Sequence, residues 1–347
     1  MNQNICSNVV CVPGGWGTHS QYSGYDILAD RLESLGARIE RAREHSFAAR
    51  LAGKFWLEAS GLSRMKLTHV YGARMFLDER RLRLSAANAS VVHFLSAENS
   101  FSFLRRPNIV CTFHGTPKIW DESLRSREPL KALRAAIALA PNQVPYLRQS
   151  IQDVVLIPYG VDPMAFAPGN PSLKSRGALR LVVVGSFMRD FEALDRIARA
   201  TADRSDLEFL ILGPLKETRR FQRYAHCRVL PRLTYMEYLA FLQGADALFL
   251  PLLDAAANTA IVEAMACGLA IMTNRGEGQA YYVGDAGWLY ENEEEALEIL
   301  TEPSFKEQCV ERGAKARARV LERFSWEKIV PQVVGLYSRL TGSTTPF

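Results

Sequence analysis

One acidic residue, Glu263, lies in a predicted helix of small and apolar residues within the stretch PLLDAAANTAIVEAMACGLA (251–270). Glutamate is rarely buried without a partner, so this carboxylate is a candidate for ligand binding. The apolar run ALFLPL (247–252) comes before it, and Asn258 or Thr259 can cap the helix. A helix that starts at the end of a parallel strand offers N–H groups and its positive dipole end to an anion. Glu263 follows one turn later on the same face, where it can accept hydrogen bonds from two neighbouring ribose hydroxyls.

The elements that would position this helix are short apolar strands that alternate with helices along the whole chain. Such alternation indicates parallel sheets covered by helices on both faces. Strands are predicted at 8–12, 37–42, 91–95, 108–113 and 154–158, and again at 179–185, 207–213, 227–231, 247–252 and 269–274. Helices are predicted at 24–36, 189–203, 235–244, 258–267 and 293–302.

The segment APGNPSLKSRG (167–177) is rich in Pro, Gly, Ser and charge, so it is the natural linker between two halves. We expect two doubly wound α/β domains, residues 1–168 and 169–324, that face each other across a cleft with ligands at the carboxyl ends of the strands. The helical pattern at 325–341 is expected to pack back on the first domain. Pro331 should kink this helix or divide it into two pieces.

The composition of the 347 residues, 48% hydrophobic and 23% charged, is that of a soluble globular protein. No apolar run reaches the roughly 18–20 residues of a membrane span. A secretory signal would require a basic region before the first apolar stretch, and the sequence has none there. The six cysteines form no CxxC pair and lie mostly in apolar runs, which favours reduced thiols and a cytoplasmic location. No cluster of residues suggests a metal site.

The net charge of +5 is unevenly spread, because residues 31–134 hold 19 Lys/Arg against 10 Asp/Glu. A solvated basic surface is one interpretation. Attraction to an anionic partner, such as a membrane face or a phosphorylated substrate, is another. The segment 63–84 mixes basic and apolar residues, which suits a membrane-facing helix or loop. No nucleic-acid-binding module is recognisable, so nucleic acid is not an expected partner.

Several segments in the right order resemble the retaining glycosyltransferases of family 4, also called glycosyl transferases group 1. The first is EAMACG (263–268) after a strand that ends in Pro-Leu. The others are VVHFLSAENSF with NIVCTFHGTP (91–117), LAPNQVPYLRQS with VVLIPYGVDPMAFAP (139–168), LVVVGSFMRDFEAL (181–194) and FSWEKIVPQVVGLY (324–337). The resemblance implies the GT-B fold, with an acceptor domain at 1–168 and a donor domain at 169–324.

The resemblance also implies an activity. Family 4 enzymes transfer a sugar, here of the hexosyl type, from a nucleotide-sugar to an acceptor hydroxyl with retention of configuration and without a metal or cofactor. A role in polysaccharide or glycoconjugate biosynthesis would follow. The partners would be the nucleotide-sugar and a glycan or lipid-linked acceptor. A lipid-linked intermediate at the inner membrane face would suit the basic first domain, whose charge makes an anionic membrane surface a further candidate partner.

Residue by residue, the resemblance implies that Glu263 binds the ribose hydroxyls and that Asn258 and Thr259 bind the diphosphate. His114 matches a histidine beside the transferred sugar, although a histidine after a strand is often structural. The glycine-rich first loop contributes Gly14, Gly15 and Gly17, the base lies near Leu230, Pro231 and Arg232, and Lys216 is a further phosphate contact.

Three departures from the family pattern stand out. The first glutamate of the E-x7-E pattern falls at Ala255, and Asp254 can replace it if the loop shifts. After the first strand of the second domain the family usually has an Arg and a Lys, but here Ser186 and Phe191 stand at these positions. Arg189 is therefore the predicted cation for the leaving phosphate. The loop 274–279 carries Glu277 where a Gly-Gly-x-x-Glu run is commoner. The predicted catalytic residues are therefore His114, Arg189 and Glu263, with Ser186 and Asp254 added to the donor site.

Two alternatives remain open from the sequence. A nicotinamide-dependent oxidoreductase is suggested by Gly15-x-Gly17 and by Glu40 near the end of the next strand, although the third glycine is absent. A non-catalytic nucleotide-sugar-binding module is suggested by the losses at Ala255, Ser186 and Phe191. The donor base, the sugar and the acceptor are not specified by the sequence.

Overall fold

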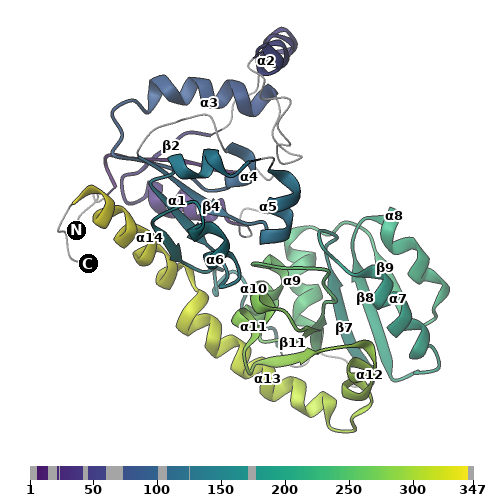
Figure 1. Cartoon of the computed structure of the whole chain (residues 1–347). Coiled ribbons are helices and arrows are strands. Elements are labelled where there is room, and N and C mark those ends of the chain that lie inside the picture. Colours follow the sequence, from purple (N-terminus) through teal and green to yellow (C-terminus); the bar gives the residue numbers. More distant parts are fainter. Residues whose placement is uncertain are drawn as a thin grey trace. The chain divides into compact units, whose positions relative to one another are not determined.

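The computed structural model describes residues 6–14, 22, 24–41, 46–59, 73–100, 108–124, 126–170 and 177–342. The chain divides into two compact units. The first comprises Met1–Pro158 and Trp326–Phe347, and the second comprises Tyr159–Ser325. Each is an α/β unit built on one parallel sheet of six strands, as the alternating pattern of the sequence predicts (Figure 1).

The first sheet has the order β2-β1-β3-β4-β5-β6, and all of its neighbouring strands are parallel. The chain starts at β1, moves to the edge strand β2 on one side and then to β3 on the other. Its strands are β1 Val9–Val12, β2 Arg38–Ile39, β3 Val91–Phe94, β4 Ile109–Phe113, β5 Ala135–Ala138 and β6 Val154–Leu156. Its helices are α1 Ile27–Glu33, α2 Phe47–Ala59, α3 Ala73–Ser85, α4 Ala97–Ser100, α5 Pro117–Ser123, α6 Gln143–Arg148 and α14 Trp326–Thr341, with a 3₁₀ helix at Glu128–Ala132.

The second sheet has the order β12-β11-β10-β7-β8-β9, again parallel throughout. Its strands are β7 Leu179–Val184, β8 Leu207–Leu212, β9 Cys227–Leu230, β10 Ala247–Phe249, β11 Ala270–Asn274 and β12 Gly287–Tyr290. Its helices are α7 Phe191–Ala200, α8 Leu215–Thr218, α9 Tyr235–Gln243, α10 Thr259–Ala266, α11 Glu277–Val283, α12 Glu293–Thr301 and α13 Phe305–Arg319. A 3₁₀ helix at Arg219–Arg223 and a π-helical turn at Val320–Phe324 complete the unit.

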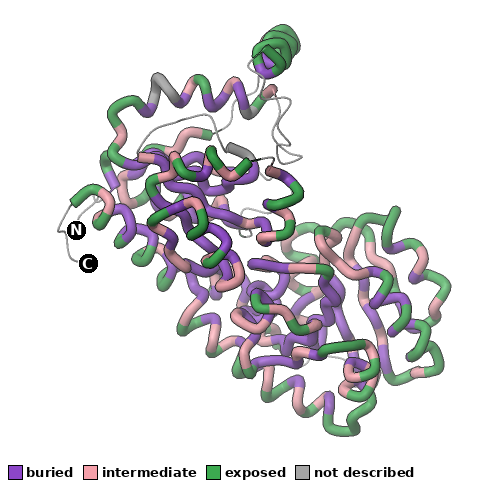
Figure 2. Tube along the Cα trace, viewed as in Figure 1, coloured by how far each residue is buried: buried purple, intermediate pink, exposed green. Residues whose placement is uncertain are grey.

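The strands of both sheets form the buried cores, because helices cover both of their faces (Figure 2). Strand β5 shows how this burial decides structure. Its sequence, AAIA, has no β-branched pattern beyond Ile137, and the sequence did not predict it, yet all four of its residues are fully buried. Its place between β4 and β6 selects the strand, since β-structure depends on context more than on local preference. Strand β12, at the edge of the second sheet, was not predicted from the sequence either.

Helix α14 packs with the first unit and runs from Trp326 to Thr341 as one helix. The prediction that Pro331 divides it is wrong: the helix continues through the proline. Buried side chains such as Ile329, Val333 and Tyr337 line one face of the helix and offset a cost of about 3 kcal/mol for an internal proline.

A buried polar cluster ties α14 to the first sheet. Nδ1 of His93 lies 2.6 Å from the hydroxyl of Tyr337, and Nε2 lies 2.8 Å from the hydroxyl of Thr112. Burial, and after it the charge of His114, lowers the pKa of His93 to about 3, so this imidazole is neutral in the folded protein. The hydroxyl of Tyr25 lies 3.4 Å from that of Thr112 and extends the cluster toward α1.

Residues 159–168 belong to the second unit, whereas the sequence places the boundary at residue 168. The hydroxyl of Tyr235 donates to the carbonyl of Ala165 at 2.6 Å, and the amide of Gln243 donates to the carbonyl of Ala167 at 2.8 Å. Helix α9 therefore holds the beginning of the segment that leads into β7.

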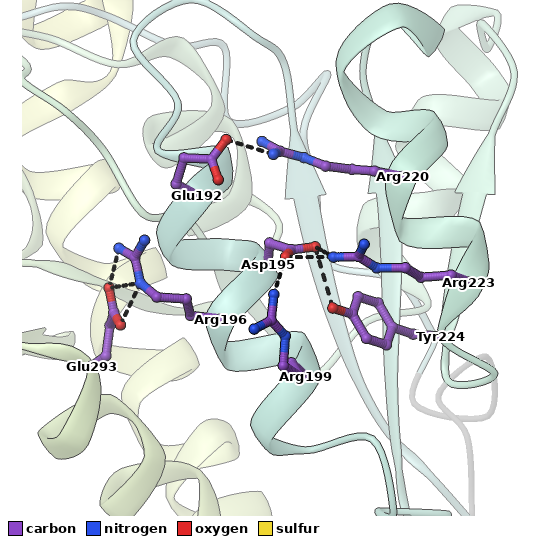
Figure 3. A network of polar contacts seen from close by, with 8 residues as sticks. All are labelled: Glu192, Asp195, Arg196, Arg199, Arg220, Arg223, Tyr224 and Glu293. Carbon is purple, nitrogen blue, oxygen red and sulfur yellow. Dashed lines mark hydrogen bonds and ion pairs between the residues drawn. The ribbon is translucent and has the colours of Figure 1, made fainter.

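Helix α7 is fixed to its neighbours by a set of ion pairs (Figure 3). Asp195 is buried, and Nη2 of Arg223 donates to its two carboxylate oxygens at 2.7 and 2.6 Å while Nη2 of Arg199 lies 3.2 Å from one of them. Arg196 donates through Nε to both oxygens of Glu293 on α12, at 2.9 and 2.7 Å. The loop between β7 and α7 thus ends on a helix that is held at several points.

Candidate functional site at the switch point of the second sheet

The loops that follow β7 and β10 meet where the winding of the second sheet reverses. Strands β8 and β9 lie on one side of β7, and β10, β11 and β12 lie on the other. In open parallel sheets, ligands bind outside the carboxyl ends of the strands at this switch point. The two loops are joined directly, since the N–H of Asp190 donates to the carbonyl of Pro251 and the N–H of Leu253 donates to that of Met188, both at 2.9 Å.

The guanidinium of Arg189 is held over the end of β7. Its Nε donates to the carbonyl of Val184 at 2.7 Å, and Nη1 donates to the carbonyl of Phe187 at 2.8 Å. Gly185, with φ of +83°, leaves room for the group, because a Cβ there would lie 3.0 Å from Nη2. Met188 has φ of 57°, an uncommon value for a residue with a side chain. The tight turn thus places Arg189 at the carboxyl end of the sheet.

The charge of Arg189 has no carboxylate partner among the ion pairs of the described residues. Burial lowers its pKa to about 10, and the nearby Tyr238 acts in the opposite direction. The group is still protonated at neutral pH. A desolvated cation without a counter-charge is costly, and a bound anion would supply that charge.

The first turn of α10 lies beside this cation. Asn258 is the N-cap residue in an extended conformation, but its side chain makes no capping hydrogen bond. Its Oδ1 lies instead 3.5 Å from Nη2 of Arg189. Thr259 is the first helical residue and is half-buried. The N–H groups of the first turn thus carry no side-chain cap, and together with Arg189 they form a positively polarised end of the site.

Glu263 is buried, with 3% of its surface exposed, as its apolar surroundings in the sequence indicated. The hydroxyl of Tyr238, from α9, donates to Oε2 of Glu263 at 2.8 Å. Burial first, and the charge of Glu263 second, raise the pKa of Tyr238 well above its usual value, so the phenol remains a hydrogen-bond donor. The carboxylate is therefore oriented by a neighbouring helix.

The loop that carries Asp254 and Ala255 is fixed on two sides. A Cβ on Gly278 would lie 2.3 Å from the carbonyl oxygen of Ala255, so only glycine lets α11 approach the loop this closely. The side chain of Asn274 accepts from the N–H of Leu252 at 2.8 Å and donates to its carbonyl at 2.9 Å. Ala255 is buried and Asp254 is half-buried. A shift of the loop that moved Asp254 into the position of Ala255 would break these contacts.

The other predicted donor residues of this unit lie after the carboxyl ends of its strands. The carbonyl of Ser186 accepts from the N–H of Arg189 at 3.2 Å and closes the turn after β7. Lys216 is exposed on α8, and Leu230, at the end of β9, is half-buried. Pro231 and Arg232 are exposed in the loop between β9 and α9. The topology thus gathers these positions at one edge of the sheet.

The first unit presents its own predicted residues at the carboxyl ends of β1 and β4. The N–H of Gly14 donates to Oδ1 of Asp26 at 2.8 Å. Gly15 and Gly17 lie outside the described residues. In the oxidoreductase hypothesis Glu40 binds a ribose, but here its carboxylate lies 3.4 Å from Arg38 and 3.3 Å from Arg81.

His114 is oriented by the loops after β3 and β4. Its Nε2 donates to the carbonyl of Leu95 at 2.8 Å, and its ring meets that of Tyr25 edge-on at 4.9 Å. The buried carboxylate of Glu98 accepts from the N–H of His114 at 2.8 Å and from that of Gly115 at 2.6 Å. The histidine is therefore part of a preorganised turn.

Two residues that orient the candidate site were missed by sequence reasoning. Tyr238 lies in a helix that was assigned no role, and Glu98 lies in the segment VVHFLSAENSF without a distinguishing pattern. For Glu98, the one available signal was an acidic residue in the segment that follows the buried strand β3. For Tyr238 no local signal existed, because its partner is contributed by a different helix.

In the part of the chain described by the structure, no three His, Cys, Asp or Glu side chains are arranged to hold a metal ion. All six cysteines are buried. Within the same residues, every helix is too short or too polar to span a bilayer.

The two parallel six-stranded sheets have the GT-B fold of solved glycosyltransferase structures. Residues 171–301 match the family described as Glycosyl transferases group 1. The matched segment lies inside the second unit, which spans Tyr159–Ser325. No curated protein matches the sequence at a significant level.

Three solved structures illustrate the likeness of fold. Sucrose-phosphate synthase from Thermosynechococcus elongatus is 15% identical, with a TM-score of 0.66 over 97% of this chain and 100% of that chain. HepE from Anabaena, solved with UDP-glucose, is 15% identical, with a TM-score of 0.68 over 95% and 99%. The UDP-forming α,α-trehalose-phosphate synthase from Burkholderia vietnamiensis is 13% identical, with a TM-score of 0.69 over 97% and 100%.

Proposed function

We propose that this protein is a retaining glycosyltransferase of family 4 that transfers a sugar from a nucleotide-sugar to an acceptor hydroxyl. One observation carries the proposal. At the switch point of a domain that matches Glycosyl transferases group 1, a half-buried cation without a carboxylate partner among the described ion pairs, an uncapped helix start and an oriented carboxylate lie on adjoining elements. This set suits a nucleoside diphosphate, which has two phosphates and two neighbouring ribose hydroxyls.

In the proposed complex, each group has one task. The carboxylate of Glu263 accepts hydrogen bonds from the ribose hydroxyls, and Tyr238 keeps its orientation. Arg189 and the first-turn N–H groups at Asn258 and Thr259 bind the diphosphate. The exposed loop after β9 and Lys216 on α8 offer contacts to the base and to phosphate.

Transfer needs stabilisation of the departing diphosphate more than it needs a strong base. As the bond from the anomeric carbon to the phosphate oxygen breaks, a bond to the acceptor oxygen forms on the same face, and the acceptor proton passes to that phosphate oxygen. Negative charge develops on the diphosphate, where Arg189 and the dipole of α10 act. These groups supply the charge that a metal ion would otherwise provide, so we propose that the reaction is metal-independent.

The first unit is the proposed acceptor domain, and His114 is its contribution beside the transferred sugar. The fixed orientation of this histidine by Leu95 and Glu98 supports a positioned role. We further propose a glycan or lipid-linked acceptor in polysaccharide or glycoconjugate biosynthesis, and a cytoplasmic location. The neighbour solved with UDP-glucose makes UDP-sugars the first donors to test.

The test is incubation of the purified protein with UDP-, GDP- and ADP-sugars, with release of the nucleoside diphosphate as the readout. Release with one donor, also in the presence of EDTA, is expected. The anomeric configuration of the product, read by NMR, reports retention. If no nucleotide binds and no donor is turned over, the proposal is wrong.

A non-catalytic nucleotide-sugar-binding module is the second candidate, and Ala255 is the observation that favours it. The loop around Ala255 is fixed by α11 and Asn274, so a carboxylate does not replace the missing one without rearrangement. This candidate predicts tight nucleotide binding without release from any donor. An Ala255→Glu variant that gains turnover would support it.

A further inference from the structure

Helix α2 of the first unit turns its apolar face outward. Four of the twelve exposed large apolar side chains among the described residues lie on this one helix. They are Phe47, Leu51, Phe55 and Trp56, exposed by 77%, 61%, 66% and 55%, and we call them the α2 face. Contiguous exposed apolar side chains of this kind mark an interaction surface.

The exposure is a consequence of how α2 packs. Its buried residues are Gly53 and Leu57, which face α3. A Cβ on Gly53 would lie 2.9 Å from the side chain of Leu77, so the two helices are in close contact on that side. Phe47 and Leu51 recur at a spacing of four residues and therefore lie on another side of the helix. Figure 1 shows α2 at the rim of the first unit, and Figure 2 shows it almost entirely exposed.

The exposed charges around the α2 face are mostly positive. Arg50 and Lys54 flank it on α2, where Glu58 is the one exposed acid. Helix α3 adds Arg74 and Arg80, both exposed.

The acids of α3 do not offset these cations at the surface. Asp78 and Glu79 are 7% and 3% exposed. The guanidinium of Arg80 lies 5.8 Å from the ring centre of Trp56, which places a cation at the edge of the apolar surface. The surface of α2 and α3 is therefore apolar at its centre and cationic at its border.

We propose that the α2 face docks on an anionic lipid bilayer. An aromatic and aliphatic face flanked by Lys and Arg is the pattern of a helix that lies in the membrane interface, where a tryptophan sits at the level of the headgroups. The bilayer supplies both an apolar layer for the α2 face and negative headgroups for the cations. A second copy of the chain would bring the same cations together and is disfavoured by charge. The docking does not depend on the transfer reaction.

The experiment is sedimentation of the full chain with vesicles of neutral phosphatidylcholine, with or without about one third phosphatidylglycerol. Binding to the anionic vesicles is expected to exceed binding to the neutral ones at least roughly tenfold and to weaken at high salt. The triple variant Phe47→Ser/Leu51→Ser/Phe55→Ser should lose binding at least roughly tenfold. The charge variant Arg50→Glu/Lys54→Glu should lose the preference for anionic vesicles.

A matched control replaces exposed apolar residues of the second unit, Met164→Ser/Met236→Ser/Val310→Ser, and should bind as the wild type does. All substituted positions are exposed, and equal thermal unfolding of the variants checks their folding. Size-exclusion chromatography with light scattering tests a self-association face. The proposal is wrong if the triple variant binds vesicles as well as the wild type does. It is also wrong if the wild type forms a dimer and does not bind vesicles, while the triple variant is a monomer. A wild-type protein that releases nucleotide from a donor but does not bind the vesicles would refute the docking alone and leave the proposed function standing.

Discussion

Replacing Arg189 by glutamine tests whether its charge binds a diphosphate. The guanidinium is protonated, desolvated and without a carboxylate partner among the described ion pairs. A charge-assisted hydrogen bond contributes about 1.5–3 kcal/mol. Loss of that contribution corresponds to roughly 10- to 150-fold weaker binding of the diphosphate.

The same substitution also removes hydrogen bonds within the protein. Nε and Nη1 of Arg189 donate to the carbonyls of Val184 and Phe187, and their loss costs about 1–3 kcal/mol of stability. A general disturbance of the loop would weaken the binding of every ligand, whereas loss of the charge weakens the binding of phosphate-bearing ligands only. The nucleoside without phosphates therefore serves as an internal reference.

The assay is isothermal titration of the best-binding nucleoside diphosphate and its parent nucleoside to wild type, Arg189→Gln and Arg189→Lys. We expect Arg189→Gln to weaken binding of the diphosphate and to leave binding of the nucleoside nearly unchanged. Arg189→Lys should retain part of the wild-type affinity for the diphosphate. The salt dependence of diphosphate binding should become shallower in Arg189→Gln. The control is Arg196→Gln, which removes an exposed cation paired with Glu293. Equal diphosphate affinity in Arg189→Gln and wild type, within about twofold, would refute the reasoning.

Three further predictions concern Tyr238 and Glu98, which orient site residues, and His93, which belongs to the buried cluster beneath α14. Tyr238→Phe removes the donor to the buried Glu263 carboxylate and should lower the free energy of unfolding by about 1.5–3 kcal/mol in urea titrations; an unchanged midpoint would contradict the contact. The folded-state pKa of His93 is lowered to about 3. Below pH 6.5 the unfolded chain therefore takes up a proton that the folded chain does not, and the free energy of unfolding falls by about 1.4 kcal/mol for each pH unit by which the pH is lowered. His93→Gln should flatten this part of the decline between pH 6.5 and 5, as followed by thermal unfolding, and parallel curves for variant and wild type would argue against it. Glu98→Gln weakens the acceptor for the backbone N–H of His114 and should lower kcat about tenfold with donor affinity kept; an equal loss in both would point to general damage.

Local patterns in the chain predicted the strands of both sheets except β5 and β12, because a strand buried on both faces must be apolar throughout. The same reasoning predicted that Glu263 is buried after β10, which the structure confirms. The roles of the individual donor and acceptor residues stay predictions, since no ligand tests them.

What the sequence by itself determined is the class of fold, because the periodicity of apolar residues that marks buried strands and helices is encoded locally. The edge of the second sheet at which a ligand binds stays a prediction, and the order of the strands was decided by the tertiary structure. The tertiary structure alone decided the partners of the key groups: Tyr238 for Glu263, Glu98 for His114, and Gly278 against the loop of Ala255. These contacts join separate elements, and their geometry depends on how loops and helices pack around a completed sheet. The same holds for the outward face of α2, since a helical pattern shows which residues share a side but not which side the neighbouring helix covers.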